Sequence, residues 1–137
     1  MLRGEEIKSI IPQREPIMMI DTLFGASETD GESGLTVLDT NIFCQGGQLR
    51  EPGIIEHIAQ TAAAFNGCRL KEGENPKLGY IGEIKKCQIS ALPKVGDTIR
   101  TKVHLEAQVM NVNLMTAESK VGDKLIATCQ IKLFEEE

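Results

Sequence analysis

The sequence predicts an α+β fold in which an antiparallel sheet wraps around one long helix. Residues 51–67 form the predicted helix, because apolar side chains recur there every three to four residues on most of the helix surface. The second half of the chain alternates apolar and polar side chains with a period of two, which is typical of strands covered on one face. A helix so apolar is buried only if several strands wrap around it, and this favours a layered α+β architecture.

The N-terminal part is expected to hold a short helix and a β-hairpin. Residues 5–11 carry isoleucines on one side and stop at Pro12, which ends the helix because proline cannot continue it. The run at 17–29 is apolar and extended, as expected of a strand. Gly31 to Gly34 predict a turn, and residues 33–40 then form the second strand of the hairpin.

The rest of the chain is expected to complete the sheet. A glycine-rich loop at 44–53 leads into the helix, and a polar turn at 71–77 follows it. The remaining strands are predicted at residues 78–90, 98–110, 114–121 and 125–134. Gly122-Asp123 is expected to form the tip of the last hairpin.

Length and composition bound the possible functions. A chain of 137 residues fits a single domain at 1–137, since about 150 residues can bury roughly 70% of their unfolded surface. The net charge of −5 argues against broad nucleic-acid binding, which needs a basic face. No apolar run approaches the roughly 20 residues that cross a bilayer, and no export signal is recognised, so we expect a cytoplasmic protein that does not bind membranes. The four scattered cysteines predict neither a metal site nor a disulfide framework.

Glu56 is the leading candidate for a functional residue because it places a carboxylate within the apolar helix. Burying such a group costs on the order of several kcal/mol unless it is paired, protonated or facing a cleft. Gln60 lies four residues further along, where it is expected to hold Glu56 through an i to i+4 pair. His57 is the second candidate. Adjacent helical residues point about 100° apart, so one of Glu56 and His57 would have to act across a dimer interface.

Four segments of the chain resemble the motifs of one enzyme family. The first is IPQREPIMMID, which resembles that family's LPHRxPFLLVD, and the second is NIFCQGG, which resembles NxxFFQGH. The third is EPGIIEHIAQTAA, similar to PGVLxxEAMAQ, and the fourth is ALPKVGDTIR, similar to PVxPGDxL. The family is that of the hotdog-fold 3-hydroxyacyl-ACP dehydratases, and the resemblance covers nearly the whole chain. It implies an acyl thioester of fatty-acid or polyketide-like metabolism, carried on acyl carrier protein or coenzyme A and bound in a tunnel at a dimer interface.

The resemblance also implies roles for single residues. Dehydration takes a proton from C2 while the C3 hydroxyl leaves with another, and the family uses a histidine and an acid for these steps. The acid matches Glu56, whereas the two family histidines match Gly47 and Gln13, which leaves His57 as the nearby candidate base. The amide of Gly53 matches the helix-opening glycine that holds the thioester carbonyl in the family.

The resulting prediction is a dehydratase-like protein that needs no metal or other cofactor and forms a homodimer or a higher assembly. Its expected catalytic residues are Glu56 and His57, and its expected substrate-binding residues are Gly46, Gly47, Gly53 and Gln60. Two alternatives stay open. A hotdog acyl thioesterase would use Glu56 alone to activate a water molecule, and a non-catalytic acyl-binding or partner subunit would pair with an active homologue.

Overall fold

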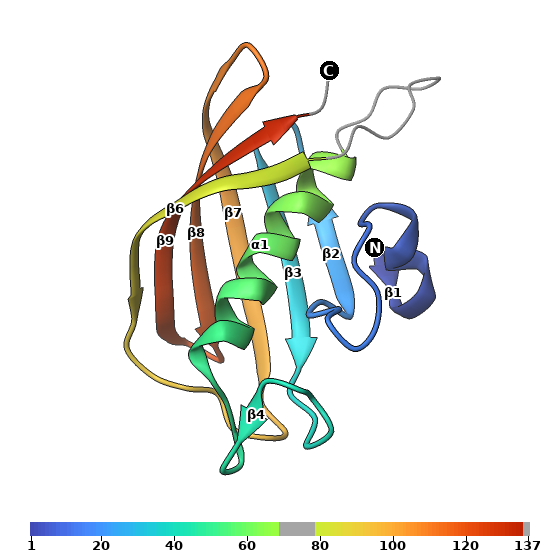
Figure 1. Cartoon of the computed structure of the whole chain (residues 1–137), viewed down its shortest axis with the longest axis vertical. Coiled ribbons are helices and arrows are strands. Elements are labelled where there is room, and N and C mark those ends of the chain that lie inside the picture. The colour runs from blue at the N-terminus through green and yellow to red at the C-terminus, as the bar shows by residue number, and fades with distance from the viewer. Residues whose placement is uncertain (69–78, 136–137) are drawn as a thin grey trace.

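The computed structural model describes residues 1–68 and 79–135, and one long helix packs on one face of a large antiparallel sheet (Figure 1). The helix α1, Glu51–Cys68, begins with Glu-Pro-Gly, and proline suits a first helical turn because its missing N–H would have no partner there. The predicted helix is confirmed to within one residue at its C-terminal end. Among the described residues, no helix is long and apolar enough to cross a bilayer.

Within the part of the chain that the structure describes, the sheet has seven strands, and each pair of neighbours runs antiparallel. Their spatial order is β1 (Leu2–Arg3), β2 (Thr22–Ala26), β3 (Asp30–Thr36), β7 (Thr98–Val109), β8 (Val112–Val121), β9 (Lys124–Glu135) and β6 (Gly79–Ile89). The helix contacts strands from β2 near one edge to β6 at the other, so the sheet wraps around it. This arrangement confirms the predicted α+β hotdog architecture.

The main core lies between α1 and the sheet. Ile54, Ile58 and Phe65 of the helix are buried in one cluster with Ile99 and Val103 of β7. Burying a side chain of this size stabilises the fold by about 1.5–3 kcal/mol relative to leaving it in water. The apolar side chains of the helix and of β7 therefore pack in the same layer, as the sequence predicts.

The hairpin formed by β2 and β3 turns at residues 27–29, so the predicted turn at Gly31–Gly34 is wrong. Both glycines lie inside β3. A Cβ atom on Gly31 would lie 2.9 Å from the ring of Phe65, and a Cβ atom on Gly34 would lie 2.8 Å from the ring of Phe24. These glycines make room for aromatic rings and do not form a turn.

Two short elements differ in detail from the sequence prediction. The N-terminal helix is a 3₁₀ helix, η1 (Gly4–Ser9), and not the longer helix predicted at 5–11. The loop before α1 contains a small hairpin of β4 (Cys44–Gln45) and β5 (Gln48–Leu49). The polar turn predicted at 71–77 lies outside the described residues.

Candidate functional site

Glu56 lies on the side of α1 that the sheet of its own chain does not fully cover. The side chain is half-buried, as are its helical neighbours Ile55 and Ala59. Its Oε1 atom accepts a hydrogen bond of 2.9 Å from Nε2 of Gln60, which is the i to i+4 pair expected from the sequence. Among the described residues, the Oε2 atom has no hydrogen-bond partner. The helix therefore presents a carboxylate with one oxygen held and the other open.

Gln60 is fully buried one turn further along the helix, and it makes three hydrogen bonds. Its Oε1 atom accepts the N–H of Met19 at 2.6 Å, and its Nε2 atom donates to the carbonyl of Ile17 at 2.8 Å as well as to Glu56. A backbone N–H can only donate and a carbonyl can only accept, so the orientation of the amide is unambiguous. The backbone of Ile17 and Met19 therefore holds the amide so that an N–H of Gln60 points to Glu56.

His57 is fully buried and faces the sheet. Its Nδ1 atom lies 2.7 Å from the carbonyl oxygen of Met19, and its Nε2 atom lies 2.8 Å from Oγ1 of Thr101. Because a carbonyl only accepts, Nδ1 carries the proton and Nε2 accepts from the threonine hydroxyl. Oγ1 of Thr101 is also 2.6 Å from Oγ of Ser119, which therefore donates to it.

Burial determines the charge of this histidine. Removing the ring from water lowers the pKa of His57 to about 4, although the Met19 carbonyl and Asp21 favour the charged form. The ring is therefore neutral near pH 7, and both nitrogens are occupied. This geometry gives His57 a structural role, and its assignment as a base stays a prediction that the geometry does not support. The physical reason is the 100° step between adjacent helical residues, which turns His57 into the sheet when Glu56 faces outward.

The second histidine lies on the opposite face of the sheet. His104 follows the buried Val103 on β7, so its side chain alternates away from the helix. Its Nδ1 atom is 2.8 Å from Oδ1 of Asp30, and this hydrogen bond raises the pKa of His104. His104 is thus an exposed partner of a surface carboxylate on the face of the sheet away from Glu56.

The glycines expected to bind substrate have clear local roles. Gly53 is buried, and its N–H already donates to the carbonyl of Arg50 at 2.9 Å. A Cβ atom there would lie 2.6 Å from Leu49, so Gly53 allows close packing at the helix start. Gly46 and Gly47 form the tip of the β4–β5 hairpin with φ values of 63° and 78°, which favour glycine. Substrate contacts of these three residues stay predictions.

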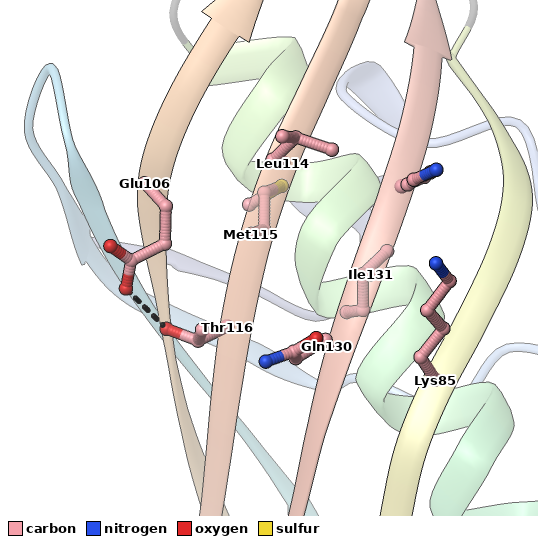
Figure 2. Close-up of a pocket in the computed structure, with 8 residues that line it drawn as sticks. Lys85, Glu106, Leu114, Met115, Thr116, Gln130 and Ile131 are labelled. Atoms are coloured by element: carbon pink, nitrogen blue, oxygen red, sulfur yellow. Dashed lines mark hydrogen bonds between the residues drawn. The ribbon is translucent and has the colours of Figure 1, made fainter.

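A hollow of about 320 Å³ lies on the face of the sheet away from the helix (Figure 2). Figure 2 shows α1 behind the strands, with Glu106 and Thr116 joined by a hydrogen bond of 3.3 Å. Lys85 and Lys132, at the other side of the hollow, both pair with Glu83. The two lysines at the hollow are therefore already paired with Glu83, and the lining of the hollow does not include Glu56. Within residues 1–68 and 79–135, no group of three or more His, Cys, Asp or Glu side chains is placed to hold a metal ion.

A row of buried hydroxyl groups on the sheet contacts the helix, and it was not predicted from the sequence. Ser33 of β3, Thr101 of β7 and Ser119 of β8 are direct neighbours across three strands, and all are fully buried. Ser33 contacts Oγ1 of Thr61, which donates to the carbonyl of His57 at 2.8 Å. The available signal was a polar residue in the apolar phase of each strand, because a buried hydroxyl requires a partner.

The comparison with known proteins decides the family. Residues 5–137 match the family model called ApeP-like, described as ApeP dehydratase. The chain belongs to the ApeP-like dehydratase family. It is also 33% identical over 138 residues to the 3-hydroxyacyl-[acyl-carrier-protein] dehydratase FabZ of Macrococcus caseolyticus, covering 96% of this chain and 93% of that protein.

Other matches agree with the ApeP-like assignment. The FabZ protein of Lactiplantibacillus plantarum is 30% identical over 139 residues, covering 96% of this chain and 92% of that protein. A solved structure described as "The Dehydratase Heterocomplex ApeI:P from Xenorhabdus doucetiae" matches with a TM-score of 0.89 at 17% identity, covering 100% of this chain and 93% of the other. The dehydratase-like function and the hotdog fold predicted from the sequence are confirmed.

Proposed function

We propose that this chain acts on a 3-hydroxyacyl thioester and that Glu56 is the proton donor. In this reaction C2 loses a proton, the C3–O bond breaks, a double bond forms between C2 and C3, and the protonated hydroxyl leaves as water. Glu56 gives its proton to the departing hydroxyl, and the carboxylate that this leaves takes the proton from C2. The observation that carries the proposal is the half-buried Glu56 carboxylate, which Gln60 holds at one oxygen and leaves open at the other.

The relatives support the substrate class. Both FabZ proteins are named as 3-hydroxyacyl-[acyl-carrier-protein] dehydratases, and similarity to them extends over nearly the whole chain. We therefore propose a thioester carried on acyl carrier protein or coenzyme A, in cytoplasmic lipid synthesis. We further propose a homodimer, because a partner would cover the outward side of α1, where Ile55 and Ala59 are incompletely buried in one chain.

A second candidate follows if a histidine takes the C2 proton, because this chain does not supply a suitable one. The chain has two histidines, and neither offers an open ring nitrogen beside Glu56, since His57 is enclosed and His104 lies across the sheet. A second copy of this chain would bring the same two residues in the same surroundings. We therefore propose as the alternative a heteromeric enzyme, in which a different dehydratase chain supplies the histidine and this chain supplies Glu56. The solved ApeI:P structure is itself described as a dehydratase heterocomplex.

One assay separates the candidates. The purified chain is incubated with a 3-hydroxyacyl thioester, and ultraviolet absorbance of the conjugated enoyl thioester is followed together with release of free thiol. Enoyl product from the chain alone supports the first candidate. Free thiol without enoyl product would show a thioesterase instead and contradict the proposal.

The alternative is tested by mixing. The chain is combined with a histidine-bearing 3-hydroxyacyl-ACP dehydratase chain whose own carboxylate has been replaced by glutamine. Enoyl product that appears only in the mixture, and disappears with Glu56→Gln, supports the heteromeric enzyme. A mixture as inactive as its parts contradicts it.

A further inference from the structure

The segment Ile17–Met19, which we call the clamped segment, lies between η1 and β2 outside the sheet. Its backbone is held from the helix side. Met19 donates its N–H to Gln60 and accepts from His57 at its carbonyl, while Ile17 accepts from Gln60 at its carbonyl. The two helical side chains, three residues apart, thus grip both polar groups of Met19. Ile17 lies in a turn and Met19 lies outside the strands, so side chains of the helix satisfy these backbone groups.

The clamped segment fixes which oxygen of Glu56 can carry a proton. The amide oxygen of Gln60 accepts from Met19, and one of its two N–H groups donates to Ile17. The second N–H therefore points to Oε1 of Glu56. An atom that receives this N–H acts as an acceptor and is not the protonated oxygen. Oε2 is then the oxygen that holds and releases the proton.

His57 holds the carbonyl group of Met19. The hydroxyl of Ser119 donates to Thr101, and the hydroxyl of Thr101 donates to Nε2 of His57. These bonds hold the neutral ring in one orientation. The proton on Nδ1 is therefore directed at the Met19 carbonyl. A change at His57 reaches Glu56 through Met19 and Gln60, although His57 itself faces away from Glu56.

We propose that His57 and Gln60 are positioning residues that clamp Ile17–Met19 and thereby reserve Oε2 of Glu56 for proton exchange. The inference deepens the proposed function and rests on it for the role of Glu56. It does not require either residue to touch the substrate.

Two substitutions of His57 form a matched test. In His57→Asn the side-chain amide nitrogen takes the place of Nδ1, so the bond to the Met19 carbonyl is kept and the link to Thr101 is lost. In His57→Gln the longer amide takes the place of Nε2, so the Thr101 link is kept and the Met19 bond is lost. A purely structural role predicts similar effects of the two variants, because each keeps one of two buried hydrogen bonds.

The positioning role predicts a difference in kcat. We expect His57→Gln to lower kcat roughly tenfold or more below that of His57→Asn with little difference in KM, because misplacing a reacting group affects the chemical step. Gln60→Met, which removes all three amide bonds at similar size, is expected to behave like His57→Gln. It also decides the question if His57→Gln fails to fold.

A second readout does not depend on activity. In protein labelled with ¹³C at the glutamate carboxyl carbons, the signal of Glu56 is the one lost in Glu56→Gln. It should move in Gln60→Met and His57→Gln and stay in place in His57→Asn. The inference is overturned if Gln60→Met leaves the signal unmoved, or if the two His57 variants shift it alike. If the wild type makes no enoyl product, either alone or mixed with the histidine-bearing chain, the proposed function fails, while this signal still decides the clamp.

Discussion

The buried ring of His57 should make this protein less stable in acid. The unfolded chain has an ordinary histidine pKa of 6.5, and burial lowers the pKa of His57 in the folded chain to about 4. Between these values the unfolded state binds a proton that the folded state does not, so the free energy of unfolding falls as pH falls. The stabilisation is complete above about pH 6.5 and is lost progressively towards pH 4.

The structure sets the size of this effect. A difference of about 2.5 pKa units between the folded and unfolded ring corresponds to about 3 kcal/mol at the acid end, at roughly 1.4 kcal/mol per unit. About 2 kcal/mol of this should be gone by pH 5, before ordinary carboxylates protonate extensively. Such a loss is a large part of the stability of a typical domain, which is about 5–15 kcal/mol.

Urea unfolding followed by circular dichroism at a series of pH values and at one protein concentration measures this loss. The control is His57→Asn, which cannot titrate and keeps the bond to Met19. The variant should be less stable than wild type at pH 7.5 and should lose less stability between pH 7.5 and pH 5. Parallel curves for the two proteins over this range would refute the neutral, enclosed ring.

Two further stability predictions follow from the core, and urea unfolding measures both. Gly31→Ala should cost about 1–3 kcal/mol because its Cβ would approach the buried Phe65 ring to 2.9 Å, whereas Gly25→Ala, with no atom within 4 Å, should change stability by less than about 0.5 kcal/mol. Equal effects would mean that the ring moves aside. Thr61→Val should cost about 1–3 kcal/mol because it leaves the buried Ser33 hydroxyl without this partner, and adding Ser33→Ala should cost less than the sum of the single changes. If the double variant loses as much stability as the two single variants together, Thr61 and Ser33 do not interact.

Local patterns predicted the elements of this fold well. The helix at Glu51–Cys68 has an apolar repeat and a Pro-Gly start, and both signals lie within the helix itself. The strands β7 to β9 follow the two-residue alternation, and Gly122 at the predicted hairpin tip has a φ of 60°, as such a turn requires. The same logic failed at Gly31, where the reason for glycine is the ring of Phe65, which lies on the helix, far away in the sequence.

The candidate site was predictable only in its local part. The pairing of Glu56 with Gln60 depends on helix geometry, so spacing alone predicted it. The partners of His57 are Met19 and Thr101, which lie 38 and 44 residues away, and no local pattern contains them. The sequence therefore left His57 as a candidate base, although the fold encloses it.

Replacing one carboxylate at a time shows whether Glu56 exchanges the proton. Glu56→Gln keeps the size of the side chain and removes the acid, and Glu51→Gln does the same at an exposed position of the same helix. With a 3-hydroxyacyl thioester and, if needed, the histidine-bearing partner chain, we expect Glu56→Gln to reduce enoyl formation by about 10² to 10⁴, while Glu51→Gln stays within about twofold of wild type. Full enoyl formation by Glu56→Gln would show that Glu56 is not the proton donor.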